Sequence, residues 1–267
     1  MSRLRERMKS LSESGRKALV IYLTEGDPSP GGTAEIVTAA ADAGADVIEL
    51  GVPFSDPNAD GPVIQAAMQR AREAGCGLKT ALGTARAARR AGCDAPIVLF
   101  GYYNPIFVYG IERFAGDAAD AGVDALLTVD VPMDELGEVA EPLQRAGLDV
   151  VPLVAPTSGE ERIARLAELE PPFVYYISMT GVTGAAFRGT SGGEARIAAV
   201  REAAAAPVAV GFGIKTGDDA RQVAGYADGV VVGSAVVSCI ASAEGGREAE
   251  AVASLVSELR AAIDEAG

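Results

Sequence analysis

Histidine is absent from this chain of 267 residues, and cysteine and lysine are scarce. Without histidine, the sequence cannot build a Ser-His-Asp triad, a Cys-His pair or a metal site with imidazole ligands. The three cysteines, Cys76, Cys93 and Cys239, are scattered and include no CxxC spacing. This usage is typical of reduced thiols in a cytoplasmic protein, and we expect neither a disulfide framework nor a metal.

Positive charge is also in short supply, because the formal net charge is −14 at pH 7. Binding to nucleic acid or to an anionic membrane requires a basic face, so we expect neither. No apolar run approaches the roughly 18 residues of a membrane span. Aromatic residues make up only 5% of the chain, so several of them at one place would indicate a pocket.

Apolar strand patterns alternate with helical patterns along the whole chain, 49% of which is hydrophobic. Strands are expected at residues 18–24, 46–50, 96–102, 124–129, 149–154, 173–178, 208–210 and 229–232. Helices are expected at 33–43, 63–74, 78–91, 111–121, 134–146, 194–205, 218–224 and 247–262, with one more opened by a capping box of Thr157 and Glu160. Eight such units predict one domain over residues 1–267, a single (β/α)₈ TIM barrel. An open doubly wound sheet is the alternative, but its glycine fingerprint after the first strand is missing.

Two further patterns add to this prediction. Leu4, Met8 and Leu11 are spaced i, i+4, i+7, which predicts an extra amphipathic helix at the N-terminus, lying against the fold. The tetrapeptide Ala-Gly-x-Asp recurs at 43–46, 91–94, 121–124 and 146–149. Each copy predicts a helix that ends with glycine at the C′ position and leads into a strand, so the four copies form an internal repeat.

A carboxylate stands inside the second predicted strand. Glu49 interrupts the apolar run 46–50, where an ionised side chain is costly unless it has partners or stays protonated. A second carboxylate, Asp60, lies at the far end of the loop that follows. Two carboxylates in different surroundings can act as a general acid/base pair. A purely structural glutamate, paired with an arginine or with backbone amides, is the alternative.

Glycine-rich loops follow the last three predicted strands. They are the segment 180–193, the turn Gly211-Phe-Gly213 and the pair Gly233-Ser234. In TIM barrels, loops of this kind bind phosphate through backbone N–H groups at the carboxyl ends of the strands. The aromatic residues Tyr22, Tyr102, Tyr175 and Phe212 are expected near the same rim, where they would line a flat apolar pocket, although core packing remains an alternative for Phe212.

Two other polar residues near this rim have alternative interpretations. Asp130 ends the fourth predicted strand and is expected to cap a loop, although a supporting role behind the site is the alternative. Lys215 lies beyond the Gly211-Phe-Gly213 turn, which favours a surface position over the Schiff-base lysine of an aldolase.

Several motifs together resemble the α subunit of tryptophan synthase. The motifs run in order from about residue 15 to 240, and the second of them is long and highly specific. They are Gly26-Asp-Pro28, Glu49-Leu-Gly-Val-Pro-Phe-Ser-Asp-Pro-Asn-Ala-Asp-Gly-Pro62, Gly181-Val-Thr-Gly184, Gly211-Phe-Gly-Ile214 and Gly233-Ser-Ala235. The chain departs from the family at Glu25, at Met179 and Thr180, and in the segment Val237-Ser-Cys239. None of these departures involves Glu49 or Asp60.

The resemblance implies retro-aldol cleavage of indole-3-glycerol phosphate to indole and glyceraldehyde 3-phosphate. It implies that Glu49 moves protons at indole C3 and at the glycerol hydroxyl, and that Asp60 stabilises charge on the indole N–H. Tyr22, Tyr102 and Tyr175 would line the indole pocket. Gly184, Gly213, Gly233 and Ser234 would bind the phosphate, and Thr183 would lie in a closing loop that excludes water and helps to align Asp60. Phe212 is expected to bind the substrate as a further aromatic residue near the pocket.

The resemblance also implies a partner. This is a β subunit that carries pyridoxal phosphate and receives indole in an α₂β₂ assembly, whereas this chain needs no cofactor of its own. Three alternatives stay open at this point: a stand-alone lyase that releases free indole, a non-catalytic barrel that activates a partner, and a lysine-dependent aldolase.

Overall fold

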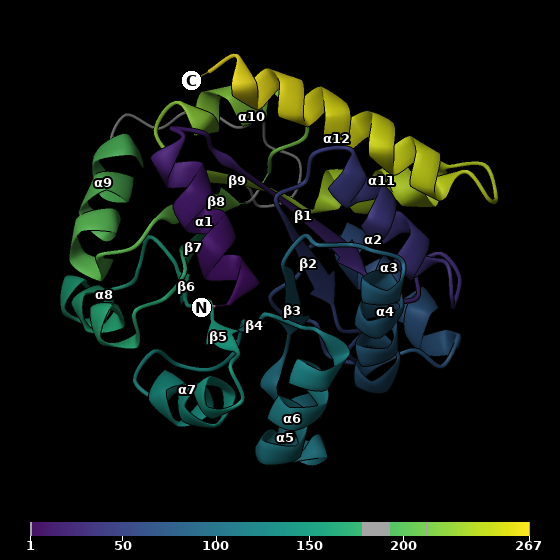
Figure 1. The fold of residues 1–267 in the computed structure, drawn as a ribbon, viewed down its shortest axis with the longest axis horizontal. Helices are drawn as coiled ribbons and strands as arrows, with labels where there is room; N and C mark the ends of the chain where they lie inside the picture. Colours follow the sequence, from purple (N-terminus) through teal and green to yellow (C-terminus); the bar gives the residue numbers. More distant parts are fainter. Residues whose placement is uncertain (1, 178–192, 212, 267) are drawn as a thin grey trace.

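The computed structural model describes residues 2–177, 193–211 and 213–266, and its strands form one parallel sheet. Within these ranges the sheet order is β5-β4-β3-β2-β1-β9-β8-β7-β6. The strands are β1 Ala18–Thr24, β2 Val47–Gly51, β3 Ile97–Gly101, β4 Ala125–Thr128, β5 Asp149–Val150, β6 Leu153–Val154, β7 Val174–Ile177, β8 Val208–Gly211 and β9 Gly229–Val232. Figure 1 shows these strands at the centre of the molecule, surrounded by helices.

The two ends of the sheet order are one stretch of chain. Strands β5 and β6 are separated only by Val151 and Pro152, and both fall within the single strand predicted at 149–154. The amide of Val151 donates to the carbonyl of Leu126 in β4, whereas the carbonyl of Pro152 accepts from the amide of Tyr175 in β7. This stretch therefore joins the two edges of the sheet, and the predicted (β/α)₈ TIM barrel is confirmed.

The helices agree with the predicted alternation and add two elements to it. They are α1 Arg3–Glu13, α2 Thr33–Asp42, α3 Pro62–Glu73, α4 Leu78–Arg90, α5 Tyr103–Tyr109, α6 Ile111–Ala121, α7 Leu136–Arg145, α8 Glu160–Arg165, η1 Leu166–Leu169, α9 Gly193–Ala204, α10 Gly217–Ala224, α11 Ser234–Ser242 and α12 Glu248–Asp264. The sequence patterns did not predict α5 or α11, because their residues are rich in aromatic and β-branched side chains that favour strands. No helix of the described residues is long and apolar enough to cross a membrane.

One predicted helix start was wrong. The residue preceding α8 is Gly159, not Thr157, and no side chain in the described part of the chain caps this helix. The Ser158 hydroxyl instead accepts a hydrogen bond from the backbone N–H of Ala155. The polar residues before α8 therefore stabilise the turn that leads into the helix.

The internal repeat behaves as predicted. Its glycines, Gly44, Gly92, Gly122 and Gly147, all have positive φ angles, which glycine adopts without steric cost. The aspartates that close three of the copies, Asp46, Asp124 and Asp149, are buried. The repeat thus ends each helix and places a carboxylate at the start of the next strand.

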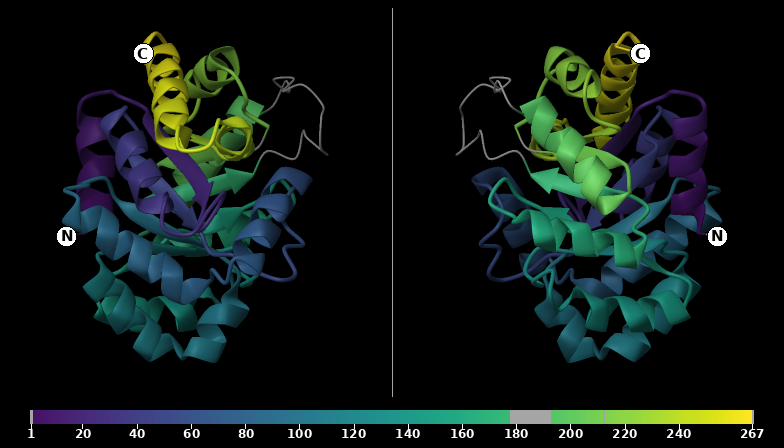
Figure 2. Two further views of the ribbon diagram at one scale, coloured as in Figure 1. Left: turned by 90° about the vertical axis from the view of Figure 1, so that its right-hand side faces the viewer. Right: turned by 90° about the vertical axis from the view of Figure 1, so that its left-hand side faces the viewer.

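Helix α1 lies across the amino-terminal ends of the strands and closes that end of the barrel (Figures 1 and 2). Its apolar face, Leu4, Met8 and Leu11, is buried in the same cluster as side chains from inside the barrel. The predicted amphipathic helix is therefore confirmed, and it separates the barrel interior from water at this end.

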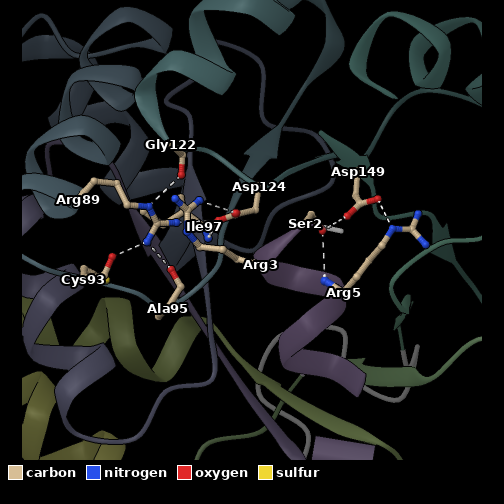
Figure 3. Close-up of polar contacts among 10 residues, drawn as sticks. All are labelled: Ser2, Arg3, Arg5, Arg89, Cys93, Ala95, Ile97, Gly122, Asp124 and Asp149. Atoms are coloured by element: carbon tan, nitrogen blue, oxygen red, sulfur yellow. Dashed lines mark hydrogen bonds and ion pairs between the residues drawn. The ribbon is translucent and has the colours of Figure 1, made fainter. Parts of the chain in front are cut away.

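The polar face of α1 pairs with the repeat aspartates. Arg3 Nη1 lies 3.0 Å from Asp124 Oδ1, and Arg5 Nε lies 2.7 Å from Asp149 Oδ1 (Figure 3). Asp124 also accepts Arg89 Nη2 at 2.6 Å and the amide of Ile97 at 2.8 Å. One buried carboxylate therefore connects α1, α4 and β3, and its hydrogen bonds offset the cost of its burial.

We expect Asp124→Ala to lower the free energy of unfolding by about 3–5 kcal/mol, because it leaves the half-buried Arg89 guanidinium without its carboxylate. Urea unfolding followed by circular dichroism measures the change. The matched control is Asp94→Ala, at the same position of the repeat but exposed, with an expected change within about 0.5 kcal/mol. Equal losses in the two variants would contradict this account of Asp124.

Candidate active site

A cavity of about 470 Å³ opens at the carboxyl ends of the strands, opposite α1. Its lining comes from β1, β2, β3, β6, β7 and β9, from the loop that follows β2 and the start of α3, and from the segments that follow β4, β8 and β9. The predicted site residues found in this lining are Tyr22, Glu49, Asp60, Tyr175, Gly213, Gly233 and Ser234. Thr183, Gly184 and Phe212 lie outside the described residues.

Glu49 reaches the cavity from the middle of β2. Alternation along the strand turns Ile48 and Leu50 toward the surrounding helices, whereas Val47 and Glu49 face the barrel interior. The side chain is 0% exposed, and among the described residues neither carboxyl oxygen has a hydrogen-bond partner. Burial without partners raises the pKa of Glu49 to about 8, so the carboxyl is mostly protonated at neutral pH.

Asp60 stands at the mouth of the same cavity, at the end of the loop between β2 and α3. Its Oδ2 accepts a hydrogen bond of 2.7 Å from the hydroxyl of Tyr102, which lies directly after β3. Burial raises the pKa of Asp60, whereas the bond from Tyr102 lowers it. Tyr102 itself is absent from the cavity lining, because its hydroxyl is turned toward the loop.

Tyr22 and Tyr175 form the aromatic wall of the cavity together with Phe100. The rings of Tyr22 and Phe100 meet edge to face at 5.2 Å, and Phe100 lies 6.2 Å from the ring of Tyr175. Burial, with the charges of Asp60 and Glu49 in addition, raises the pKa of both tyrosine hydroxyls, which therefore stay protonated. The wall is thus largely apolar, and its three rings are inclined to one another rather than coplanar.

Several lining residues escaped the sequence analysis. They are Ala59, Gly61, Pro62, Val63, Ile64, Phe100, Val129, Leu153, Ile177, Ile214 and Val231. The strand residues among them could have been found from the alternation of side chains, because Ile177 lies two positions after Tyr175 and therefore faces the same side. Among the loop residues, Ala59, Gly61 and Ile214 stand inside the motifs that carry the family resemblance, and this was their signal in the sequence.

The tyrosines fit only because the neighbouring strands have glycine opposite their rings. A Cβ atom at Gly211 would lie 2.7 Å from Cζ of Tyr175, and one at Gly51 would lie 2.6 Å from Cζ of Tyr22. Both distances are shorter than a van der Waals contact. The absence of a side chain at these two glycines therefore leaves the space that the rings of Tyr22 and Tyr175 occupy.

We expect Gly211→Ala to lower the free energy of unfolding by about 1–3 kcal/mol, because Tyr175 must leave its position against β8. Urea unfolding measures the loss. Gly116→Ala in α6 is the control, since none of the described residues outside the helix lies within 4 Å of its added methyl group and an alanine in a helix is favourable. A Gly211→Ala variant as stable as wild type would contradict the predicted overlap.

Two glycines and the start of a helix also line the cavity. Gly213 has a φ of +78°, Gly233 precedes α11, and Ser234 is the first residue of that helix. The first N–H groups of a helix have no partner within the helix, so they can bind an anion. The glycine-rich turns predicted for phosphate binding therefore line the same cavity as the two carboxylates.

Asp130 caps a helix beside the site, and Lys215 lies at the cavity itself. Asp130 Oδ1 accepts the amide of Tyr103 at 2.8 Å, so it caps the start of α5, as expected. Lys215 lines the cavity, although the residue as a whole is exposed. Within the described part of the chain, no group of three or more His, Cys, Asp or Glu residues could hold a metal ion.

Comparison with known proteins decides the family. The family model described as "Tryptophan synthase alpha chain" matches residues 8–264. The chain belongs to the tryptophan synthase alpha chain family. It is 50% identical over 266 residues to the tryptophan synthase alpha chain of Geobacter sulfurreducens, with 98% of this chain and 99% of the relative covered. It is 47% identical to that of Thioalkalivibrio sulfidiphilus, with 99% and 100% covered.

Solved structures of the tryptophan synthase alpha chain family agree. The crystal structure of tryptophan synthase subunit alpha from Legionella pneumophila matches with a TM-score of 0.92 and 36% identity, and 99% of each chain is covered. A tryptophan synthase structure from M. tuberculosis matches with a TM-score of 0.87 and 34% identity, over 98% of each chain. The resemblance found in the motifs is confirmed.

Proposed function

We propose that this chain is the α subunit of a tryptophan synthase, a carbon–carbon lyase. It cleaves indole-3-glycerol phosphate by a retro-aldol reaction to indole and glyceraldehyde 3-phosphate. The observation that carries the proposal is one cavity with a buried carboxyl on its floor, which has no hydrogen-bond partner among the described residues, and a second carboxylate at its mouth. Two carboxyl groups in such different surroundings can divide acid and base roles between them.

Glu49 supplies the proton transfers in this reaction. Its pKa of about 8 keeps the proton on the carboxyl at neutral pH, and from there it is donated to C3 of the indole ring. The carboxylate then takes the proton of the hydroxyl on the adjacent glycerol carbon. The bond between that carbon and C3 breaks, its electron pair returns to the ring, and the hydroxyl carbon becomes the aldehyde. Glu49 ends protonated, as it began.

Asp60 acts on the other side of the flat ring. Protonation at C3 leaves positive charge on the ring nitrogen, and a carboxylate that accepts the N–H stabilises this charge. Tyr22, Tyr175 and Phe100 enclose the ring, and the substrate's phosphate binds the N–H groups at Gly213, Gly233 and Ser234. Thr183, Gly184 and Phe212 are proposed to complete the enclosure and to exclude water.

The proposal includes the setting of the reaction. Residues 1–267 act as one domain in the cytoplasm, without a cofactor of their own. Indole passes to a β subunit that carries pyridoxal phosphate, within an α₂β₂ assembly. Coupling between the two sites would involve the loop at Asp56 and the loop that follows β7.

Indole release from indole-3-glycerol phosphate tests the proposal, measured for the purified chain alone and after addition of a β subunit. We expect slow release by the chain alone and a sharp rise with the partner. Fast release that the partner does not change would favour the stand-alone lyase, and no release in either case would reject the reaction. Borohydride trapping of substrate on Lys215 would favour the aldolase.

A further inference from the structure

Tyr102 makes two hydrogen bonds to the loop that carries Asp60. Its hydroxyl donates to Asp60 Oδ2 at 2.7 Å and accepts the amide N–H of Ala59 at 2.9 Å. The side chain is buried, and it contributes nothing to the cavity lining. A residue whose only role was to line the cavity would not make this pair of contacts with two consecutive loop residues.

The ring and the backbone of Tyr102 are also held in place. Phe54, near the start of the same loop, stacks on the ring with centroids 4.8 Å apart and planes 25° apart. The backbone follows β3 directly, and the next amide, of Tyr103, donates to Asp130 Oδ1. Tyr102 is thus fixed to the barrel at one end and contacts both ends of the loop at the other.

From these contacts we infer that Tyr102 is a positioning residue: it holds Asp60 at the mouth of the cavity in the orientation in which the carboxylate meets the substrate. The inference rests on the proposed function and deepens it, because it concerns how Asp60 reaches the indole nitrogen. With Oδ2 engaged by the Tyr102 hydroxyl, Oδ1 is the oxygen left for the ring N–H. A fixed acceptor loses no orientational freedom when charge develops on the ring.

The hydroxyl bond also affects the protonation of Asp60. Burial raises the pKa of this carboxyl and the Tyr102 bond opposes that rise, so removing the hydroxyl shifts the pKa upward. The other titratable groups that line the same cavity are Glu49, Tyr22, Tyr175 and Lys215. A substitution at Tyr102 leaves all four in place, so a changed titration of Asp60 reports on the hydroxyl.

Tyr102→Phe is the decisive variant, because it keeps the ring and its stacking on Phe54 but removes the hydroxyl. We expect kcat for indole release to fall about tenfold or more, with KM changed less than about twofold. The acidic limb of the kcat/KM profile moves to higher pH, since Asp60 must be ionised to accept the N–H. The control is Tyr109→Phe, which removes another tyrosine–aspartate bond, 2.5 Å to Asp117, away from the cavity.

Two measurements separate this inference from the proposed function. Carbon-13 titration of Asp60 in the substrate-free protein needs no turnover, and the Asp60 pKa should rise in Tyr102→Phe but not in Tyr109→Phe. If Tyr102 acts through Asp60, the double variant with Asp60→Asn has the activity of Asp60→Asn alone. The inference would be overturned if Tyr102→Phe kept the wild-type kcat, whether or not its KM rose. It would also be overturned if the pKa of Asp60 were the same in Tyr102→Phe as in wild type. A wild-type protein that releases no indole would instead reject the function.

Discussion

Replacement of Glu49 by glutamine is expected to lower indole release by about 10²–10⁴-fold, the range typical of a lost general acid/base. Glutamine matches the shape of the protonated carboxyl but cannot donate its proton to C3 or accept one from the hydroxyl. Since the wild-type carboxyl is buried and has no hydrogen-bond partner in the described part of the chain, the variant disturbs no structural bond there. Rates with and without a β subunit measure the effect.

The matched control is Glu25→Gln. Glu25 is also a buried carboxyl with a raised pKa caused by burial, but it does not line the cavity. Loss of a carboxyl at that position should leave indole release within about twofold of wild type, because the side chain touches no substrate. Unchanged release by Glu49→Gln would favour the non-catalytic barrel or a different chemistry, and equal losses in both variants would point to a general effect of buried carboxyls.

The barrel could be predicted because the sequence patterns that mark its helices and strands are local. The Ala-Gly-x-Asp copies mark helix ends by a glycine that adopts positive φ, and the apolar runs between them mark buried strands. The break of the fifth strand at Val151 and Pro152 could not be read from its apolar pattern. The break arises because β5 pairs with β4 and β6 pairs with β7. These pairings exist only once the sheet has closed into a barrel.

In the candidate site, too, features that are local in sequence could be predicted, whereas contacts between distant segments could not. Glu49 was evident as a charge inside an apolar strand, and its burial follows from that position. The contact of Tyr102 with Asp60 spans 42 residues and depends on how the loop folds back over β3. The position of Tyr102 after a strand and the family resemblance therefore placed it only in the cavity wall. Phe100, in the wall, could have been predicted from the inward alternation of β3 had the phase of that strand been followed.

Stability should depend on pH through Glu49, because its pKa is about 8 in the folded chain and near 4.5 when unfolded. Below pH 4.5 both states are protonated and the carboxyl has no effect. Between pH 4.5 and 8 the unfolded state releases the proton and the folded state keeps it, so stability falls as pH rises. The total loss is on the order of 5 kcal/mol, at about 1.4 kcal/mol per pH unit, and it levels off above pH 8.

Glu49→Gln isolates this contribution, because glutamine does not titrate and the other ionisable groups are shared with wild type. The difference in free energy of unfolding between variant and wild type, from urea unfolding at pH 5 to 9, should grow with pH and then become constant. A difference that stays flat would mean that Glu49 ionises normally in the folded chain and finds partners there. A rising difference would mean that the carboxyl lowers stability at neutral pH, a cost that folding tolerates to keep a proton donor beneath the substrate.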